Sequence, residues 1–346
     1  MLPFMRLPSP PSLTELRAGT PSVPKIKTQG RRPFWSVMIP TYNCGPFLRR
    51  TMESVLAQAL GPDVMQIEVV DGCSTKDDPE GMVRDIGGGR IAFHRLPRNQ
   101  GPAHTFNTCI ERARGKWVHI LHGDDIVFPG FYAAYDDVIG AHPEARMVIG
   151  QVAIIDENDR WTKLYGAVPP VGGGILLEFV KEQVTRTLTM CPSVVVRRDA
   201  YEEAGGFCTL FAHVTDWDMW FRVGQLAPVA CVARPYAGFR HHSHQDYTGQ
   251  LKVAGRNIEE CYFAVRVNLA RLNGAASSID ESAWRSHWAL QAEMMAEFFG
   301  AQHCAEGRYN QLLWASRLEP NRRRLQALAL AWVRHKLSSN RAAAKR

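Results

Sequence analysis

Two adjacent carboxylates follow an apolar segment in the stretch LHGDDIVFPG, residues 121–130. The segment before them, KWVHIL, is rich in strand-forming residues, so Asp124 and Asp125 are expected at the end of a strand. Neighbouring carboxylates repel each other, and water, a helix N-terminus or a bound cation relieves that repulsion. A hard divalent cation with oxygen ligands suits such a pair. For this stretch taken alone, a strand that ends in an aspartate-capped turn is the simpler interpretation.

The segments that position this pair alternate between two periodicities. Strand-like runs at 34–39, 66–71, 90–96 and 116–121 are separated by segments with apolar residues at helical spacing, and the run ARMVIGQVAIID at 145–156 reads as further strand structure. This order predicts an α/β fold with a parallel sheet and helices on its faces. In such sheets the ligand crevice lies outside the carboxyl ends of the strands. Three polar segments, 41–43, 71–77 and 122–125, follow the strands, and we expect them to converge in space.

The chain is expected to have three regions. Residues 1–32 are interrupted by prolines and lack the continuous apolar stretch of a secretion signal, so they are predicted to form a disordered extension. Residues 33–250 form the α/β domain, and residues 251–346 read as helices that end in a basic helix from about Arg322. No acidic residue follows Glu319. This last helix either docks peripherally on an anionic membrane surface or packs on the domain with a solvated basic face.

Composition restricts the class of protein. The chain has 346 residues, 45% of them hydrophobic, which is enough for at least one large core. A formal charge of +7 favours polyanionic partners. Nucleic acid is not expected among them, because the aromatic residues are not interleaved with Lys and Arg. The eight cysteines are scattered and form no CxxC pair, which predicts free thiols in a cytoplasmic protein. No apolar run reaches the roughly 18 to 20 residues that span a bilayer.

Two common phosphate-binding motifs are missing. The sequence has no GxxxxGK[ST] loop, and IPTYNCGPF stands after the first strand where a GxGxxG loop would be expected. The crevice therefore binds neither ATP in the P-loop manner nor a dinucleotide in the Rossmann manner. A nucleotidyltransferase would carry a glycine-rich, basic loop here, whereas residues 42–47 contain one glycine and no Lys or Arg. A metal ion would have to neutralise bound phosphates.

Four blocks give a more specific indication. In order, they are SVMIPTYNCGPFLRRTMESVLAQ, IEVVDGCSTKD, RNQGPAHTFNTCIERARGKWVHILHGDD and VRRDAYEEAGGFCTLFAHVTDWDMWFRV. They resemble the inverting family 2 glycosyltransferases with the GT-A fold, over about residues 34–248. The resemblance implies a mostly parallel sheet with helices on both faces, followed by a helical C-terminal extension. It also implies transfer of a sugar from a nucleotide-diphosphate sugar to a hydroxyl of a glycan, a lipid-linked acceptor or another acceptor, in polysaccharide or glycoconjugate biosynthesis.

The resemblance further implies roles for single residues in donor binding. The base pocket would be lined by Pro40, Thr41 and Tyr42, and Asp71 would bind the base or the ribose. Asp124 would approach the ribose or the sugar. The diphosphate would be covered by Arg240 and His242.

Two further aspartates carry the chemistry that the resemblance implies. Asp125 would coordinate Mg²⁺ or Mn²⁺ on the diphosphate, and Asp216 would be the general base. Asp218 is the alternative base, since it flanks the same tryptophan.

The chain departs from the family pattern at three positions. Gly72 stands where a second acid usually follows Asp71, His122 replaces the first acid of the metal-binding motif, and Thr215 replaces a glutamate before the base. Asp125 and Asp216 are present, which favours an active enzyme. The alternative is a catalytically inactive relative that binds sugar nucleotides or partner proteins.

Overall fold

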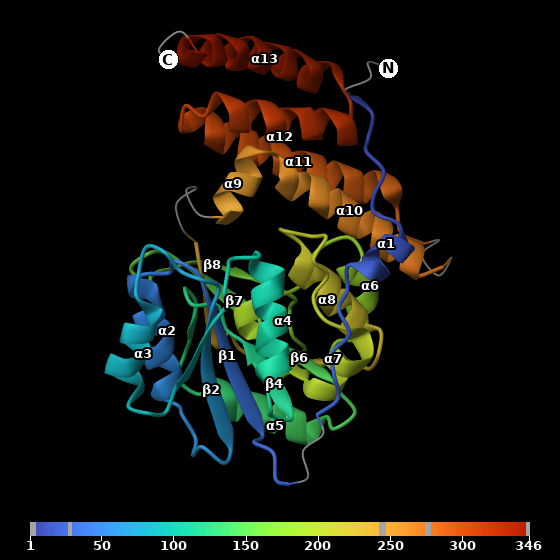
Figure 1. Cartoon of the computed structure of the whole chain (residues 1–346). Coiled ribbons are helices and arrows are strands. Elements are labelled where there is room, and N and C mark those ends of the chain that lie inside the picture. The colour runs from blue at the N-terminus through green and yellow to red at the C-terminus, as the bar shows by residue number, and fades with distance from the viewer. Residues whose placement is uncertain (1–4, 27–29, 242–246, 274–277, 344–346) are drawn as a thin grey trace. The chain divides into compact units, whose positions relative to one another are not determined.

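The computed structural model of the chain describes residues 5–26, 30–241, 247–273 and 278–343 (Figure 1). The chain divides into one compact unit of Thr14–His241 and a second that combines Met1–Leu13 with His242–Arg346. The division falls nine residues before the boundary at 250 that the sequence predicts. Among the described residues, none of the helices combines the length and the apolar character needed to cross a bilayer.

The larger unit is built on an eight-stranded sheet in the order β3-β2-β1-β4-β10-β6-β11-β9. Its strands are β1 (Trp35–Thr41), β2 (Met65–Asp71), β3 (Ala92–Arg95), β4 (Trp117–Ile120), β6 (Met147–Ile149), β9 (Gly174–Ile175), β10 (Val194–Arg197) and β11 (Val229–Cys231). The strands β3, β2, β1 and β4 are parallel, and β10 runs antiparallel between β4 and β6. The prediction of a mostly parallel sheet is confirmed.

Strand β1 explains why helices cover both faces of this sheet. Its side chains alternate between the faces, and all seven residues are buried. Val37 and Ile39 enter a core with α2 (Pro46–Leu56) and α5 (Phe131–Ala141). Met38 enters a second core with α4 (Pro102–Arg112), α7 (Arg198–Ala204) and α8 (Thr215–Gly224). The unit also contains α3 (Pro79–Gly87), α6 (Phe179–Gln183) and the short helix η2 (Cys191–Ser193).

A second, four-stranded sheet has the order β5-β12-β7-β8. It consists of β5 (Ile126–Val127), β7 (Val152–Ile155), β8 (Trp161–Tyr165) and β12 (Ala237–Arg240). The apolar run at 145–156 is therefore two strands in different sheets, and the chain crosses between them at Gly150. A side chain there would collide with its surroundings, because a Cβ would lie 2.8 Å from Val232 and 2.9 Å from the Tyr135 hydroxyl. The crossing brings β12 beside β5, directly after the acid pair.

The N-terminal segment differs from the disorder that the sequence predicts for residues 1–32. Helix α1 (Leu13–Ala18) forms there, and Leu16 is buried. The following residues bond to the α7–α8 connection: the Gly206 N–H donates to the Pro21 carbonyl and the Thr209 N–H to the Gly19 carbonyl. Composition suggested disorder because these partners lie almost two hundred residues away in the sequence.

The smaller unit is helical in its described residues, as the sequence predicts. It contains α9 (Tyr247–Val253), α10 (Arg256–Arg271), α11 (Glu281–Ala301), α12 (Ala305–Leu318) and α13 (Arg322–Ala343). Leu312, Leu328 and Ala331 form a small core with Met5 from the N-terminus. Arg324 is buried on the inner side of α13, where its guanidinium makes two hydrogen bonds to Glu293 of α11.

Candidate active site

The polar segments that follow β1, β2 and β4 meet at the carboxyl edge of the main sheet. Thr41 lies opposite Asp71 in the parallel register, and the Gly123 N–H donates to the Pro40 carbonyl at 2.9 Å. The approach at Gly123 requires glycine, because a Cβ would lie 2.8 Å from the Thr41 hydroxyl oxygen. Asn43, in the segment after β1, also contacts the segment after β2 by accepting hydrogen bonds from the Thr75 and Lys76 N–H groups. The predicted convergence is confirmed.

Asp125 is held firmly at this edge and is 1% exposed. Its carbonyl accepts a hydrogen bond from the Thr51 hydroxyl at 2.7 Å, and its Oδ1 accepts one from the Arg240 N–H at 2.8 Å. The other carboxylate oxygen, Oδ2, is buried and has no hydrogen-bond partner in the part of the chain that the structure describes. Burial, and then the negative charge of Asp124, raise the pKa of Asp125 well above its usual range. A cation beside Oδ2 would favour the ionised carboxylate.

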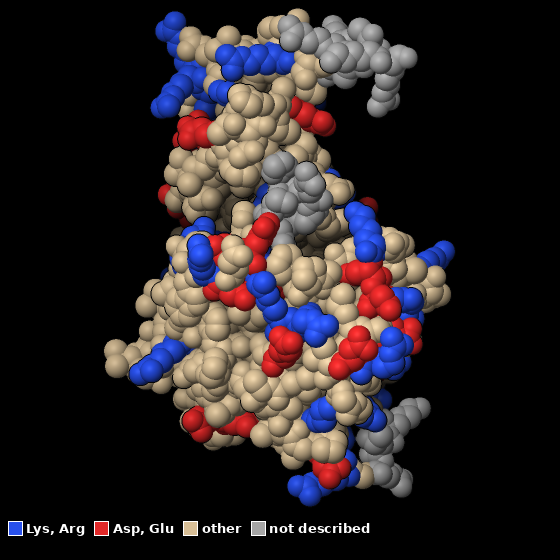
Figure 2. Space-filling view, turned by 90° about the vertical axis from the view of Figure 1, so that its left-hand side faces the viewer, with Lys and Arg blue, Asp and Glu red and all other residues tan. Residues whose placement is uncertain are grey.

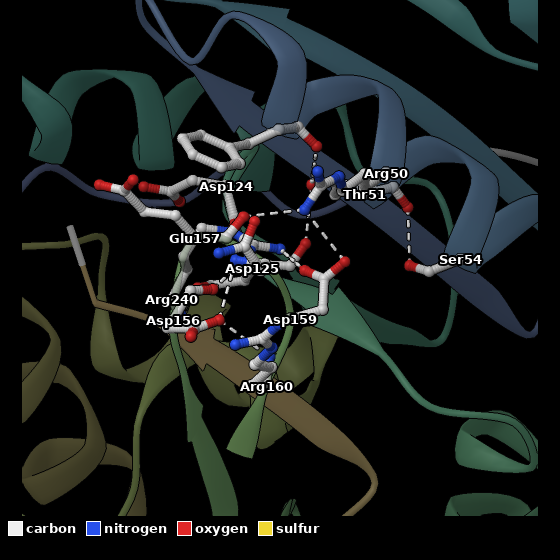
Figure 3. A network of polar contacts seen from close by, with 12 residues as sticks. Arg50, Thr51, Ser54, Asp124, Asp125, Asp156, Glu157, Asp159, Arg160 and Arg240 are labelled. Carbon is white, nitrogen blue, oxygen red and sulfur yellow. Dashed lines mark hydrogen bonds and ion pairs between the residues drawn. The ribbon is translucent and has the colours of Figure 1, made fainter. Parts of the chain in front are cut away.

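Arg240, the last residue of β12 in the second sheet, supports the acid pair (Figure 3). We call Arg240 with its ion-pair partner Asp159 the brace. Its side chain is fully buried, lies over the Phe47 ring at 4.7 Å, and donates to the Asp124 carbonyl at 2.7 Å and the Asp156 carbonyl at 2.8 Å. It also forms an ion pair with Asp159 in the β7–β8 turn. The Arg240 guanidinium therefore holds the backbone at Asp124, and the Arg240 backbone N–H holds the Asp125 carboxylate.

Asp159 ties this brace to α2. Its second carboxylate oxygen accepts a hydrogen bond from Arg50 at 3.1 Å, and Arg50 also donates to the Glu157 carbonyl at 2.9 Å (Figure 3). Sequence reasoning missed Asp159, Arg50 and Thr51. The turn DENDR reads as an ordinary exposed turn, so no local pattern in the sequence indicates these contacts.

The residues expected around the nucleotide base differ in accessibility. Pro40 and Thr41 are buried in β1, whereas Tyr42 is 43% exposed. Asp71 is fully buried, and its carboxylate accepts hydrogen bonds from the Ser74 N–H and hydroxyl and from Arg95. The Asp71 side chain thus fixes the turn after β2, while Tyr42 presents its ring at the surface.

Asp216 and Asp218 occupy different environments on the first turn of α8. Asp218 is 2% exposed and pairs with Arg222 at 2.9 Å. Arg222 also donates to the Ala204 and Gly206 carbonyls, so this pair joins α8 to the end of α7. Asp216 is only partly buried, and burial raises its pKa to about 6 against the opposing effect of the hydrogen bond from the Trp217 N–H.

The Cys191 thiol links Asp216 to the acid pair. Its sulfur lies 3.9 Å from an oxygen of Asp216. Burial, followed by the negative charges of Asp216 and Asp125, raises the Cys191 pKa well above its usual range. The carbonyl of the next residue, Pro192, lies 3.0 Å from His119 Nε2 on β4, so η2 joins Asp216 to the strand that precedes the acid pair. The sequence suggests only a small buried apolar residue at position 191, and that agrees with its 2% exposure. His242 lies outside the described residues.

The acid pair thus lies at the carboxyl edge of a mostly parallel sheet, the edge where such folds bind their ligands. Residues 36–205 match Glycosyl transferase family 2, and this domain of the chain belongs to that family.

Proteins of similar sequence or structure support this family assignment. An uncharacterized protein of Mycobacterium tuberculosis (strain CDC 1551 / Oshkosh) is 28% identical over 67% of this chain and 75% of its own length. An uncharacterized glycosyltransferase of Rickettsia felis (strain ATCC VR-1525 / URRWXCal2) is 26% identical over 66% of this chain, which spans 37% of that relative. The fold is shared with S. aureus TarS 1-349 in complex with UDP-GlcNAc, at a TM-score of 0.51 and 15% identity over 82% of this chain and 90% of that one.

Replacing Asp159 tests the brace. The Asp159→Asn variant keeps the shape of the side chain but leaves Arg240 without its ionic partner. We expect the free energy of unfolding to fall by about 1 to 3 kcal/mol and amide hydrogen exchange to accelerate in residues 122–127. Mass spectrometry of exchanged peptides measures this. Asp137→Asn, an exposed change on α5, is the matched control, and equal exchange in the two variants would contradict the brace.

Proposed function

We propose that this protein is a metal-dependent inverting glycosyltransferase that moves a sugar from a nucleotide-diphosphate sugar to an acceptor hydroxyl. The observation that carries the proposal is the cluster of ligand atoms of His122, Asp124 and Asp125 at the carboxyl edge of a family 2 domain. This cluster offers an acidic cation site, and Asp216 supplies a base that η2 joins to β4, the strand before the acid pair. The TarS structure with UDP-GlcNAc supports a nucleotide-sugar donor.

Asp216 is the general base of the proposed reaction. Its carboxylate takes the proton of the acceptor hydroxyl while that oxygen bonds to the anomeric carbon of the donor sugar. The bond from that carbon to the diphosphate breaks on the opposite face, so the nucleoside diphosphate leaves and the configuration inverts. A base with a pKa near 6 is ionised at neutral pH and still accepts a proton as the hydroxyl becomes acidic. Asp218 does not suit this role because it is buried against Arg222.

The donor would lie along the acid pair and the turn after β2. Tyr42 would contact the base, the buried residues Pro40 and Thr41 would form the floor beneath it, and Asp71 would hold the turn that borders the ribose. Asp124 would approach the ribose or the sugar. Arg240 would act by positioning Asp124 and Asp125. The proposed closure of His242 over the diphosphate rests on the family resemblance.

The side chains at this edge suit a divalent cation. Oδ2 of Asp125 is buried without a hydrogen-bond partner among the residues that the structure describes, and ligand atoms of His122, Asp124 and Asp125 all lie within 4.8 Å of one another. Asp125 would hold Mg²⁺ or Mn²⁺ against the diphosphate. When bound, the cation would neutralise the negative charge that develops on the leaving group.

Nucleotide binding tests the proposal without knowledge of the acceptor. Ligand binding to the native state raises the melting temperature by mass action. We expect one nucleoside diphosphate, or its sugar derivative, to raise the Tm in the presence of Mn²⁺ or Mg²⁺, and EDTA to remove most of the shift. In Asp125→Asn the cation-dependent part should disappear. If no nucleotide shifts the Tm of the wild-type protein, the proposed function is wrong.

Asp216→Asn separates catalysis from binding and stability. We expect transfer to fall by about 10²- to 10⁴-fold, while the nucleotide-induced Tm shift is retained. The raised pKa means that the native state binds a proton more tightly than the unfolded chain, so stability falls as pH rises from about 4 to 6. The variant should therefore unfold at an equal or higher temperature than wild type at pH 7.5.

The pKa of Asp216 predicts how the transfer rate of the wild-type enzyme depends on pH. Transfer should fall about tenfold per pH unit below pH 6, as Asp216 becomes protonated.

Asp218→Asn is the matched control for Asp216→Asn: it breaks the ion pair with Arg222 and should lower the Tm. Full transfer activity in Asp216→Asn would exclude it as the base. Nucleotide binding with no transfer in the wild-type protein, over a panel of acceptors, would favour an inactive relative.

We also propose that α13 contacts an anionic lipid surface from the cytoplasmic side. Arg322, Arg323, Arg334 and Lys336 are exposed, and the sequence has no acid after Glu319. In Figure 2 blue atoms gather at the upper end of the view, which is the height of α13 in Figure 1. Exposed apolar side chains lie among them at Leu325, Leu330, Trp332, Val333 and Leu337. This mixture suits the interface of an anionic bilayer. The eight free cysteines fit a reducing compartment.

Vesicle flotation tests this contact. We expect the protein to float with vesicles of equal parts phosphatidylcholine and phosphatidylglycerol and to stay unbound with phosphatidylcholine alone. Replacing Arg322 and Arg334 with glutamine removes two charges, worth about 2 kcal/mol, so binding should weaken roughly 30-fold. Val171→Glu, a fully exposed change in the other unit, is the control. Equal flotation of the arginine variant and wild type would exclude the contact.

A further inference from the structure

His122 lies beside the acid pair, at the position where the resembled family usually carries an acid. It follows β4 by two residues, and its Nδ1 is 3.8 Å from Oδ2 of Asp125. Two ligand atoms at this separation can both reach one ion, because typical distances from a divalent cation to nitrogen or oxygen are about 2.0 to 2.2 Å. The potential ligand atoms of His122, Asp124 and Asp125 form one cluster within 4.8 Å.

An unsatisfied buried atom points to a ligand in this cluster. Asp125 is 1% exposed, and its carboxylate oxygen Oδ1 accepts a hydrogen bond from the Arg240 N–H. Among the described residues, the other carboxylate oxygen, Oδ2, has no hydrogen-bond partner. A polar atom left in this state costs free energy, on the order of 1 to 3 kcal/mol and more when charged. The unsatisfied oxygen is the one nearest His122.

The His122 ring is held in place by stacking. It lies on the Phe106 ring of α4 with 4.9 Å between centroids and 12° between planes. Phe106 is itself buried and packs edge-on against Phe207. The Nε2 atom of His122 is buried and accepts or donates no hydrogen bond within the described residues. The imidazole therefore has a fixed orientation that directs Nδ1 toward Asp125.

We propose that His122 is a metal ligand, so that the cation site uses one imidazole and two carboxylates, from His122, Asp124 and Asp125. The inference rests on the proposed function and specifies its metal. Carboxylate and water ligands suit Mg²⁺ and Mn²⁺ alike, whereas an imidazole ligand favours transition metals. The site thus discriminates against Mg²⁺, and affinity rises from Mg²⁺ to Mn²⁺ to Co²⁺.

Pulsed EPR of the bound ion tests this ligand directly. The full-length protein is loaded with Mn²⁺ alone and then with Mn²⁺ and UDP, and electron spin echo modulation from a coordinated ¹⁴N nucleus is recorded. We expect modulation in the wild-type protein, loss of it in His122→Ala, and its retention in His142→Gln. His142 lies after α5 beside Glu144, outside the cluster. Melting temperatures measured without metal establish that all variants are folded.

Affinities for the ions give a second readout. His122→Ala should weaken Mn²⁺ binding by about 10- to 100-fold, the loss that follows disruption of metal-site ligation. His122→Asp should bind Mn²⁺ and Mg²⁺ with nearly equal affinity, because an oxygen ligand replaces the nitrogen. Isothermal titration measures both constants.

The outcomes separate this inference from the proposed function. Mn²⁺ binding that Asp125→Asn abolishes, without ¹⁴N modulation and with equal affinity in His122→Ala, would overturn the role of His122 and leave the metal-dependent transferase intact. Mn²⁺ binding that is equally weak in wild type and Asp125→Asn would overturn both. Modulation that persists in His122→Ala would assign the nitrogen to another residue and would also overturn the inference.

Discussion

Burial of the Asp125 carboxylate is the interaction on which the site depends. Removing a carboxylate from water costs several kcal/mol unless hydrogen bonds or an opposite charge compensate. The protein compensates one oxygen with the Arg240 N–H and fixes the backbone through Thr51. The second oxygen has no hydrogen-bond partner within the described ranges of the chain, and it lies 3.8 Å from Nδ1 of His122. This incomplete compensation suits a site that holds a cation, because full satisfaction by protein donors would compete with the metal.

The second sheet supplies the hydrogen bond that compensates the buried Asp125 carboxylate. Arg240 reaches Asp125 only because β12 pairs with β5, which begins at the residue after Asp125. β12 in turn pairs with β7, and the β7–β8 turn supplies Asp159 to the buried guanidinium. The chain must therefore leave the main sheet between β6 and β7, at a glycine that no larger residue could replace without displacing Val232 or Tyr135. The small sheet supports the site although the acids themselves follow strands of the large one.

Local patterns predicted much of the fold and part of the site. The strands before Asp71 and Asp125 are visible because burial leaves a periodic signal in nearby residues. Contacts between distant residues leave no such signal. The bond from Arg240 to the Asp124 carbonyl spans 116 residues, and the bond from the Cys208 thiol to the Leu16 carbonyl of α1 spans 192. For the same reason the sequence indicates Arg240 as a donor ligand by resemblance, while its role in supporting the acid pair is visible only in three dimensions.

The long separation between Asp125 and Arg240 has a consequence for how the protein is made. The part of the chain that matches the family model, residues 36–205, contains the acid pair but ends before Asp216 and Arg240. On the ribosome, the sheet strands β1 to β4 emerge well before β12, so Asp125 must stay hydrated until the last strand of the unit arrives. Pairing of segments this far apart in the sequence loses loop-closure entropy before favourable contacts form. The sheet edge that holds Asp124 and Asp125 is therefore completed last, and a chain that stops short of residue 240 would leave the Asp125 carboxylate without the Arg240 N–H.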